Sequence, residues 1–188
     1  MKPTEYGPIS PKFPHMLHGG DYNPDQWIQT PEIWDEDMRL MKLSGCNAMS
    51  VCIFSWSALE PAEGRFEFGW LDTIMDKLAK NHAYAVMATP SGSKPAWMSR
   101  AYPEIRRVKA DGVRQPHWQR HNHCRTSPVY RDKCVIINTK LASATRATRP
   151  FLSGTFRTNT MAATASASSV SMRSTRGCAS ATTTISPS

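Results

Sequence analysis

The sequence has no acidic residue beyond Asp132, although the chain continues for 56 more residues. Residues 141–188 hold five Arg, no Lys, and 29 Ser, Thr or Ala among 48 positions. The whole chain carries a formal charge of +8, whereas residues 1–140, with 18 basic and 15 acidic side chains, carry +3. Most of the basic excess therefore belongs to the C-terminal segment, and the nearly balanced body gives no reason to expect a nucleic-acid partner.

Long apolar runs are also missing. The longest, around residues 49–59, contains three serines and is far shorter than the roughly 20 apolar residues that cross a bilayer. Residues 1–14 are polar, contain four prolines and lack the apolar core of a signal peptide. The five cysteines are an odd number without compact spacing, which argues against a disulfide framework. These absences predict a cytoplasmic protein with reduced thiols and no membrane partner.

Hydrophobic patterning predicts alternating strands and helices. Three short apolar runs read as strands, at residues 16–20, 47–56 and 83–88. Helical spacing and capping signals predict helices over residues 31–44, over residues 69–82, and onward from Pro128 with Ser127 as its cap. Short apolar strands in this order are typical of an α/β fold with parallel strands buried on both faces and joined by right-handed crossovers.

The expected strand ends are rich in aromatic and polar residues. Residues 19–27, 54–61 and 89–97 combine Trp, Tyr or Phe with Asp, Asn, Ser or Thr. Aromatic faces and hydrogen-bonding groups together suit a sugar, although any single Trp can equally well close a core. A loop of about 35 residues after the third strand is too long for a simple connection. We therefore expect this loop to build part of a site.

The segment Arg120-His-Asn-His-Cys124 is the densest in chemistry-bearing side chains. His121, His123 and Cys124 are candidate metal ligands, but no second Cys stands at zinc-finger spacing. Arg120 can anchor a substrate, or can form a structural ion pair. Cys46, Cys52 and Cys134 lie on core-facing stretches and read as packing thiols.

Asp21 and Glu60 are the two carboxylates near strand ends that could face a common site. Hydrolysis of a glycosidic bond uses two such groups, at about 5–5.5 Å for retention of configuration or roughly 6.5–9.5 Å for inversion. We favour positioning or capping roles for Asp21 and Glu60 over a catalytic pair.

Several motifs, in order and at natural spacing, resemble the N-terminal part of the glycoside hydrolase family 42 β-galactosidases. The resemblance covers about residues 14–142. The matching pieces are residues 18–27 (HGGDYNPDQW), 34–42 (WDEDMRLMK), 54–61 (FSWSALEP), 64–72 (GRFEFGWLD), 88–90 (ATP), 95–97 (PAW), 103–104 (PE) and 120–131 (RHNHCRTSPVYR).

This resemblance implies the first three or so βα units of a (β/α)8 TIM barrel over residues 14–142, preceded by an arm at residues 1–13. It implies an enzyme lineage that hydrolyses terminal non-reducing β-D-galactose residues with retention of configuration. Arg120 would bind substrate, and Cys124 would be one cysteine of a structural zinc site. For the full-length parent, a homo-oligomer is the expectation.

The family's two catalytic carboxylates have no counterpart in this chain. The acid/base Glu follows an Asn at the end of the fourth strand, and the nucleophile lies near the seventh. The sequence has no Asn-Glu dipeptide and no Glu after Glu104, and Cys178 is the only cysteine in the region where further zinc cysteines are expected. We therefore predict no catalytic residue and no glycosidase activity here. The alternatives are a non-catalytic carbohydrate-binding chain, using Trp27, Trp56, Trp97 and Arg120, or a non-functional truncated product.

Residues 143–188 read as the product of a shifted reading frame. When each codon's third base is read with the next two bases, residues 143–157 can encode RYKGHPAVLIWHIS. The following residues, to 170, can encode NEYxGGDCxCELC, which supplies the Asn-Glu and three clustered cysteines. We infer a one-base insertion or deletion near codon 143, and an unstructured tail in the chain as written. A genuine Ser/Thr/Ala-rich disordered tail, or a tail whose arginines bind nucleic acid, are the other interpretations.

Overall fold

The computed structural model describes residues 15–118, 120–121 and 123–145. The predicted arm at residues 1–13, and all but the first three residues of the predicted tail, lie outside the described residues.

The centre of the fold is a three-stranded parallel sheet in the order β1-β2-β3. Its strands are β1 (Asp21–Tyr22), β2 (Ala48–Val51) and β3 (Tyr84–Met87). The register places Asp21 beside Ser50 and Ser50 beside Val86. The parallel pairing and the predicted alternation of strands and helices are confirmed.

The predicted first strand is displaced along the chain. Residues 16–20 were expected to form it, but β1 begins at Asp21. The preceding backbone still runs beside β2, because the His18 carbonyl accepts hydrogen bonds from Asn47 N at 2.8 Å and Ala48 N at 3.1 Å. An apolar run identifies an extended segment, but the regular ladder begins only where the partner strand is in register.

The three longer helices follow the apolar periodicity. They are α1 (Ile33–Leu43), α3 (Gly69–Lys80) and α5 (Pro128–Thr145). Helix α1 starts two residues after the predicted Pro31, because the first turn is closed by tighter bonds, from Ile33 N to Thr30 O and from Trp34 N to Pro31 O. The shorter elements are η1 (Pro24–Trp27), α2 (Trp56–Leu59), η2 (Pro90–Gly92), α4 (Ala96–Ala101) and η3 (Pro103–Ile105).

Helix α5 begins where the capping signal predicts. The Ser127 hydroxyl accepts a hydrogen bond from Tyr130 N at 3.4 Å, and Pro128 occupies the first helical position. The helix continues to Thr145, three residues past the predicted domain boundary at residue 142. None of the helices in the described part of the chain has the length and apolar character needed to span a membrane.

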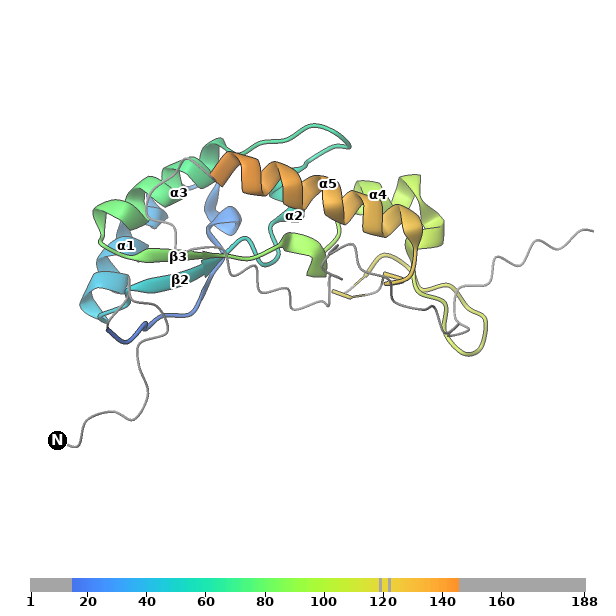
Figure 1. The fold of residues 1–188 in the computed structure, drawn as a ribbon, viewed down its shortest axis with the longest axis horizontal. Coiled ribbons are helices and arrows are strands. Elements are labelled where there is room, and N and C mark those ends of the chain that lie inside the picture. Colours follow the sequence, from blue (N-terminus) through green and yellow to red (C-terminus); the bar gives the residue numbers. More distant parts are fainter. Residues whose placement is uncertain (1–14, 119, 122, 146–188) are drawn as a thin grey trace, which may run out of the picture.

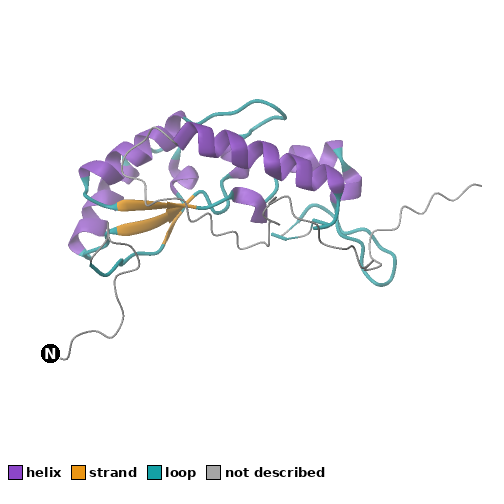
Figure 2. Ribbon diagram, in the orientation of Figure 1, coloured by secondary structure: helices purple, strands orange, loops and turns teal. Residues whose placement is uncertain are grey.

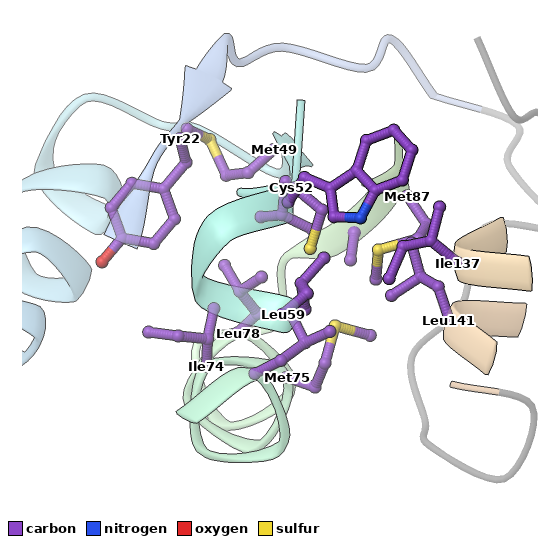
Figure 3. Close-up of a cluster of buried hydrophobic side chains, with 14 of the residues drawn as sticks. Tyr22, Met49, Cys52, Leu59, Ile74, Met75, Leu78, Met87, Ile137 and Leu141 are labelled. Carbon is purple, nitrogen blue, oxygen red and sulfur yellow. The ribbon is translucent and has the colours of Figure 1, made fainter. Parts of the chain in front are cut away.

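One apolar core joins the sheet to its helices. Figure 3 shows side chains from both longer strands, α2, α3 and α5 pointing toward one another. Six of the contributing side chains are fully buried: Leu59, Ile74, Met75, Leu78, Ile137 and Leu141. Burial of each such side chain contributes roughly 1.5–3 kcal/mol relative to full exposure.

The two faces of the sheet differ in burial, which corrects the expectation of strands covered on both sides. Met49 and Val51 face the helices and are buried, whereas Ser50 and Val86 on the opposite face are only partly covered. Figures 1 and 2 show α3 and α5 on one side of the sheet. In the described part of the chain, the sheet has a helical layer on this side alone, so the alternate residues stay accessible.

Candidate functional site

A pocket of about 180 Å³ lies at the carboxyl ends of the three strands. Its lining comes from every strand and from the segments that follow β2 and β3: Asp21, Ser50, Ile53, Phe54, Val86, Ala88, Thr89 and Gly92. Ligands of open parallel sheets commonly bind at this edge. Complete small-molecule sites typically have volumes of roughly 300–1,000 Å³. The volume of this pocket is smaller and corresponds to only part of such a site.

The strand register explains which residues line this pocket. Asp21, Ser50 and Val86 lie in one row across the sheet, and they point away from the face that packs on the helices. Strand geometry places alternate residues on opposite faces, so Tyr22, which follows Asp21, is buried on the helix side. Tyr22 there donates a hydrogen bond to Asp37 Oδ2 at 3.0 Å.

A left-handed residue shapes the wall of the pocket. Cys52, directly after β2, has a φ of +71° and is fully buried. Such a conformation is uncommon for residues other than glycine and often occurs beside functional sites. The next two residues, Ile53 and Phe54, both line the pocket. Burial raises the pKa of the Cys52 thiol, which fits the predicted packing role.

Arg120 lies beside the pocket, although the sequence separates it widely from the strands. Its guanidinium carbon lies 4.2 Å from the centroid of the Phe54 ring, and the residue is exposed. The neighbouring His121 N donates to the Gly92 carbonyl at 3.3 Å, and Gly92 also lines the pocket. The long loop therefore returns to the strand ends, as predicted, and presents Arg120 there. A role in substrate binding stays a prediction.

Glu60 has the positioning role that the sequence favours. Its buried carboxylate accepts hydrogen bonds from Trp56 Nε1 at 2.8 Å and from Gly64 N at 2.9 Å. These contacts tie α2 to the turn that follows it. Glu60 is not among the residues that line the pocket, whereas Asp21 is.

The four residues proposed for sugar contact are thus not equivalent. Trp56 is fully buried, so its ring cannot stack on a ligand, and its interpretation as a sugar-binding residue is wrong. Trp97 is half-buried and donates through Nε1 to the Glu60 carbonyl at 2.9 Å. Trp27 is 42% exposed. Core packing, which sequence composition alone does not reveal, decides between these outcomes.

The candidate metal ligands do not form a metal site by themselves. His123 is buried and stacks on Tyr130 with ring centroids 4.1 Å apart. Burial, with nearby positive charge, lowers the pKa of His123 to about 3, so the ring is neutral. Among the described residues, no group of three or more His, Cys, Asp or Glu side chains lies close enough to hold a metal ion. Cys124 Sγ lies 3.2 Å from Thr126 Oγ1, and Cys178 lies outside the described residues.

The donor set among the described residues therefore does not fit a closed zinc site, which needs four ligands.

The two remaining cysteines that the sequence predicts to be packing thiols, Cys46 and Cys134, behave as expected. Cys46 and Cys134 are half-buried, and burial raises the pKa of Cys134 to about 11.

Lys94 is a residue near the pocket that sequence patterning did not single out. It is 6% exposed, and it follows the pocket-lining Gly92 by two positions. Burial lowers the pKa of Lys94 to about 8, and the Arg106 charge acts in the same direction. The sequence signal was weak, because a single lysine in a loop is usually solvated.

Comparison with known proteins gives consistent results. The family model of glycoside hydrolase family 42, described as beta-galactosidase, matches residues 21–152. The beta-galactosidase Pbg of Clostridium perfringens is 59% identical over 137 residues, which are 73% of this chain and 20% of that protein. The beta-galactosidase GalA of Bacillus licheniformis is 57% identical over 127 residues, covering 68% of this chain and 19% of that protein.

Comparison with solved structures finds beta-galactosidases as well. The beta-galactosidase from Rahnella sp. R3 has a TM-score of 0.75 at 47% identity, over 79% of this chain and 22% of its own. The family 42 beta-galactosidase Gan42B from G. stearothermophilus has a TM-score of 0.70 at 51% identity, over 72% of this chain and 20% of its own. The fold is thus an α/β partial match to these enzymes, and the chain spans about a fifth of the length of the curated relatives that it matches.

Proposed function

Because the chain belongs to the glycoside hydrolase family 42 β-galactosidases, we propose that its strand-end pocket is part of a site for a terminal non-reducing β-D-galactose residue. The full-length parent would hydrolyse such residues with retention of configuration. The observation that carries the proposal is the convergence of Asp21, Ser50, Phe54 and Thr89 on one pocket, with Arg120 stacked at its wall.

The chemistry of these groups suits a sugar. Carboxylate and hydroxyl groups of Asp21, Ser50 and Thr89 can accept or donate hydrogen bonds to sugar hydroxyls. The Phe54 ring offers an apolar surface for the C–H groups of a pyranose. The Arg120 guanidinium presents several donors in a fixed plane, which orients a ligand more strongly than a flexible lysine does.

We infer that the 188-residue chain binds without hydrolysing. Retaining hydrolysis uses two carboxyl groups about 5–5.5 Å apart. Asp21 supplies one carboxylate to the pocket lining, while Glu60 is engaged by Trp56 and Gly64. The sequence contains no Glu after Glu104 and no Asp after Asp132. Binding without turnover is also the outcome expected of a non-catalytic carbohydrate-binding chain.

The test uses the purified 188-residue chain. Galactose and lactose are titrated into ¹⁵N-labelled protein, with glucose as the matched epimer, and a chromogenic β-galactoside is assayed in parallel. We expect galactose-dependent shifts, no hydrolysis, and at least tenfold weaker binding by Arg120→Met. Turnover that survives purification to homogeneity would contradict the inference of inactivity. Equal responses to galactose and glucose would contradict the galactose site.

Three further properties of the parent enzyme remain predictions. Cys124 would contribute to a structural zinc site only together with ligands outside the described residues. A cytoplasmic location and a homo-oligomeric assembly follow from the sequence interpretation and from the resemblance. Metal analysis of the full-length parent and of its Cys124→Ser variant tests the first of these.

A further inference from the structure

Positive charge is concentrated in the segment that follows the pocket. Residues 94–125 contain eight Lys or Arg and two Asp or Glu, whereas the other residues between 15 and 145 contain eight Lys or Arg and twelve Asp or Glu. One segment therefore carries a net charge of +6 and the remainder of this region carries −4. Such a separation creates a local field that favours anions.

Four of these cations, which we call the basic rim, lie on the loop that returns to the pocket wall: Arg106, Arg107, Arg120 and Arg125. Arg120 stacks on the pocket-lining Phe54. Arg106 is joined to His123 by an antiparallel bridge, which brings two separate parts of the loop together. The hydrogen bond from His121 N to the Gly92 carbonyl fixes this arrangement to the pocket wall.

Four carboxylates of the described residues are engaged in ion pairs away from the rim. The ion pairs formed between described side chains join Arg39 to Glu36, Arg65 to Glu67, Lys77 to Asp35 and Lys133 to Glu63. All of these pairs lie outside residues 94–125. The Arg106 Nε instead donates to the Pro103 carbonyl at 3.3 Å, and Arg107 and Arg125 are exposed.

The charges of the rim also act on neighbouring basic groups. After burial, the Arg106 charge is the next cause that lowers the pKa of Lys94. Burial and then the charges of Arg125, Arg120 and Arg107 lower the pKa of His121. Residues 146–188 contain no Asp or Glu, so their side chains cannot relieve this repulsion.

We infer that the basic rim binds a carboxylate carried by the group attached to the galactose, so that the preferred ligand is an acidic β-galactoside. The galactose half of this inference rests on the proposed function, whereas the carboxylate half rests on the rim itself. Several exposed cations acting together raise affinity severalfold at low salt, although a single exposed ion pair contributes little.

A matched pair of ligands separates the two halves. Lactobionate and lactitol both carry a β-linked galactose, and they differ by a carboxylate in place of a hydroxymethyl group. Gluconate and sorbitol are the same pair without galactose. All four are titrated into the ¹⁵N-labelled 188-residue chain at about 20 mM and about 300 mM NaCl, because salt screens charges beyond about one Debye length.

We expect lactobionate to bind at least fivefold more tightly than lactitol at low salt, with most of the difference lost at high salt. The exposed variants Arg107→Gln and Arg125→Gln should each reduce that ratio at least twofold. Lys80→Gln, an exposed lysine at the end of α3, should leave the ratio unchanged. Thermal melting of each variant checks that the fold is retained.

The outcomes distinguish the inference from the proposed function. Equal affinity for lactobionate and lactitol overturns the basic rim as a carboxylate site and leaves the galactose site standing. Binding of gluconate and lactobionate without binding of lactitol supports the rim and overturns the galactose site. Absence of binding by all four ligands overturns both.

Discussion

The guanidinium of Arg120 lies over the ring of Phe54, 4.2 Å from its centroid, across 66 residues of sequence. A cation placed over an aromatic face is attracted by the ring quadrupole, typically by about 0.5–1 kcal/mol at exposed sites. Phe54 itself is held by the turn at the left-handed Cys52 after β2. The contact therefore connects the long loop to the strand ends.

Replacement of Phe54 should change how Arg120 is presented. We expect Phe54→Leu to weaken galactose binding by the 188-residue chain about threefold, whereas Phe54→Tyr should preserve it, because the ring face is retained. The Arg120 side-chain proton signals in NMR spectra should lose their ring-current shift in Phe54→Leu alone. Unchanged Arg120 signals in that variant would contradict a positioning contact.

Glu60 offers a test of the buried anchor between α2 and its following turn. Glu60→Gln replaces one of two acceptor oxygens by a donor that faces either Trp56 Nε1 or Gly64 N. An unsatisfied buried donor costs roughly 1–3 kcal/mol, so the free energy of unfolding should fall by about that amount. Denaturation in urea measures it, and the exposed Glu32→Gln is the control. A loss of less than about 0.5 kcal/mol would show that the contacts are dispensable.

We predict opposite changes in stability when glycine is introduced after one helix and removed after another. Two residues beyond the end of α1, Gly45 has a φ of +71°, and two residues beyond the end of α3, His82 has a φ of +56°. Each position has the paired hydrogen bonds of a Schellman motif. His82→Gly should stabilise the fold by about 0.5–1 kcal/mol, and Gly45→Ala should destabilise it by about 1 kcal/mol, because the left-handed conformation strains residues with a Cβ. Thermal or urea denaturation compares both variants. Effects of the same sign would contradict this account.

Because of Lys94, we expect the free energy of unfolding to rise with pH. Its pKa in the folded chain, about 8, lies below the ordinary 10.5. The unfolded chain therefore binds the proton more tightly, and the charged form opposes folding fully below pH 8. This cost disappears as pH rises from about 8 to 10.5, so the free energy of unfolding should increase by about 2 kcal/mol between pH 7 and pH 9.5.

Lys94→Met should remove most of that slope and should raise stability at pH 7, while Lys80→Gln should keep the slope. Urea denaturation across the pH series measures both variants. A slope that is the same in Lys94→Met as in the parent chain would assign the pH dependence to other groups.

The reading-frame hypothesis can be tested directly on the gene. We expect genomic DNA sequenced from about codon 130 past the stop codon to show one base missing or extra near codon 143. The corrected frame should then encode an Asn-Glu dipeptide and three clustered cysteines. An unchanged sequence would instead establish that residues 143–188 are genuine.

The sequence by itself determined the elements whose signals are local. Leu71, Ile74, Met75 and Leu78 recur at helical spacing, and all four are buried in α3. The cap at Ser127 is likewise a contact within one helical turn. Family membership could also be inferred, because its motifs are continuous stretches of residues.

Only the tertiary structure decided the roles of side chains that meet across the chain. Trp56 and Trp97 look alike in sequence, but Trp56 is fully buried and Trp97 is half-buried. The Glu60 carboxylate accepts a hydrogen bond from the nearby Trp56 ring, whereas the strand register places Asp21 in the pocket lining. These outcomes depend on packing and register between distant segments, and no local pattern encodes which of several polar or aromatic residues the assembled core will cover.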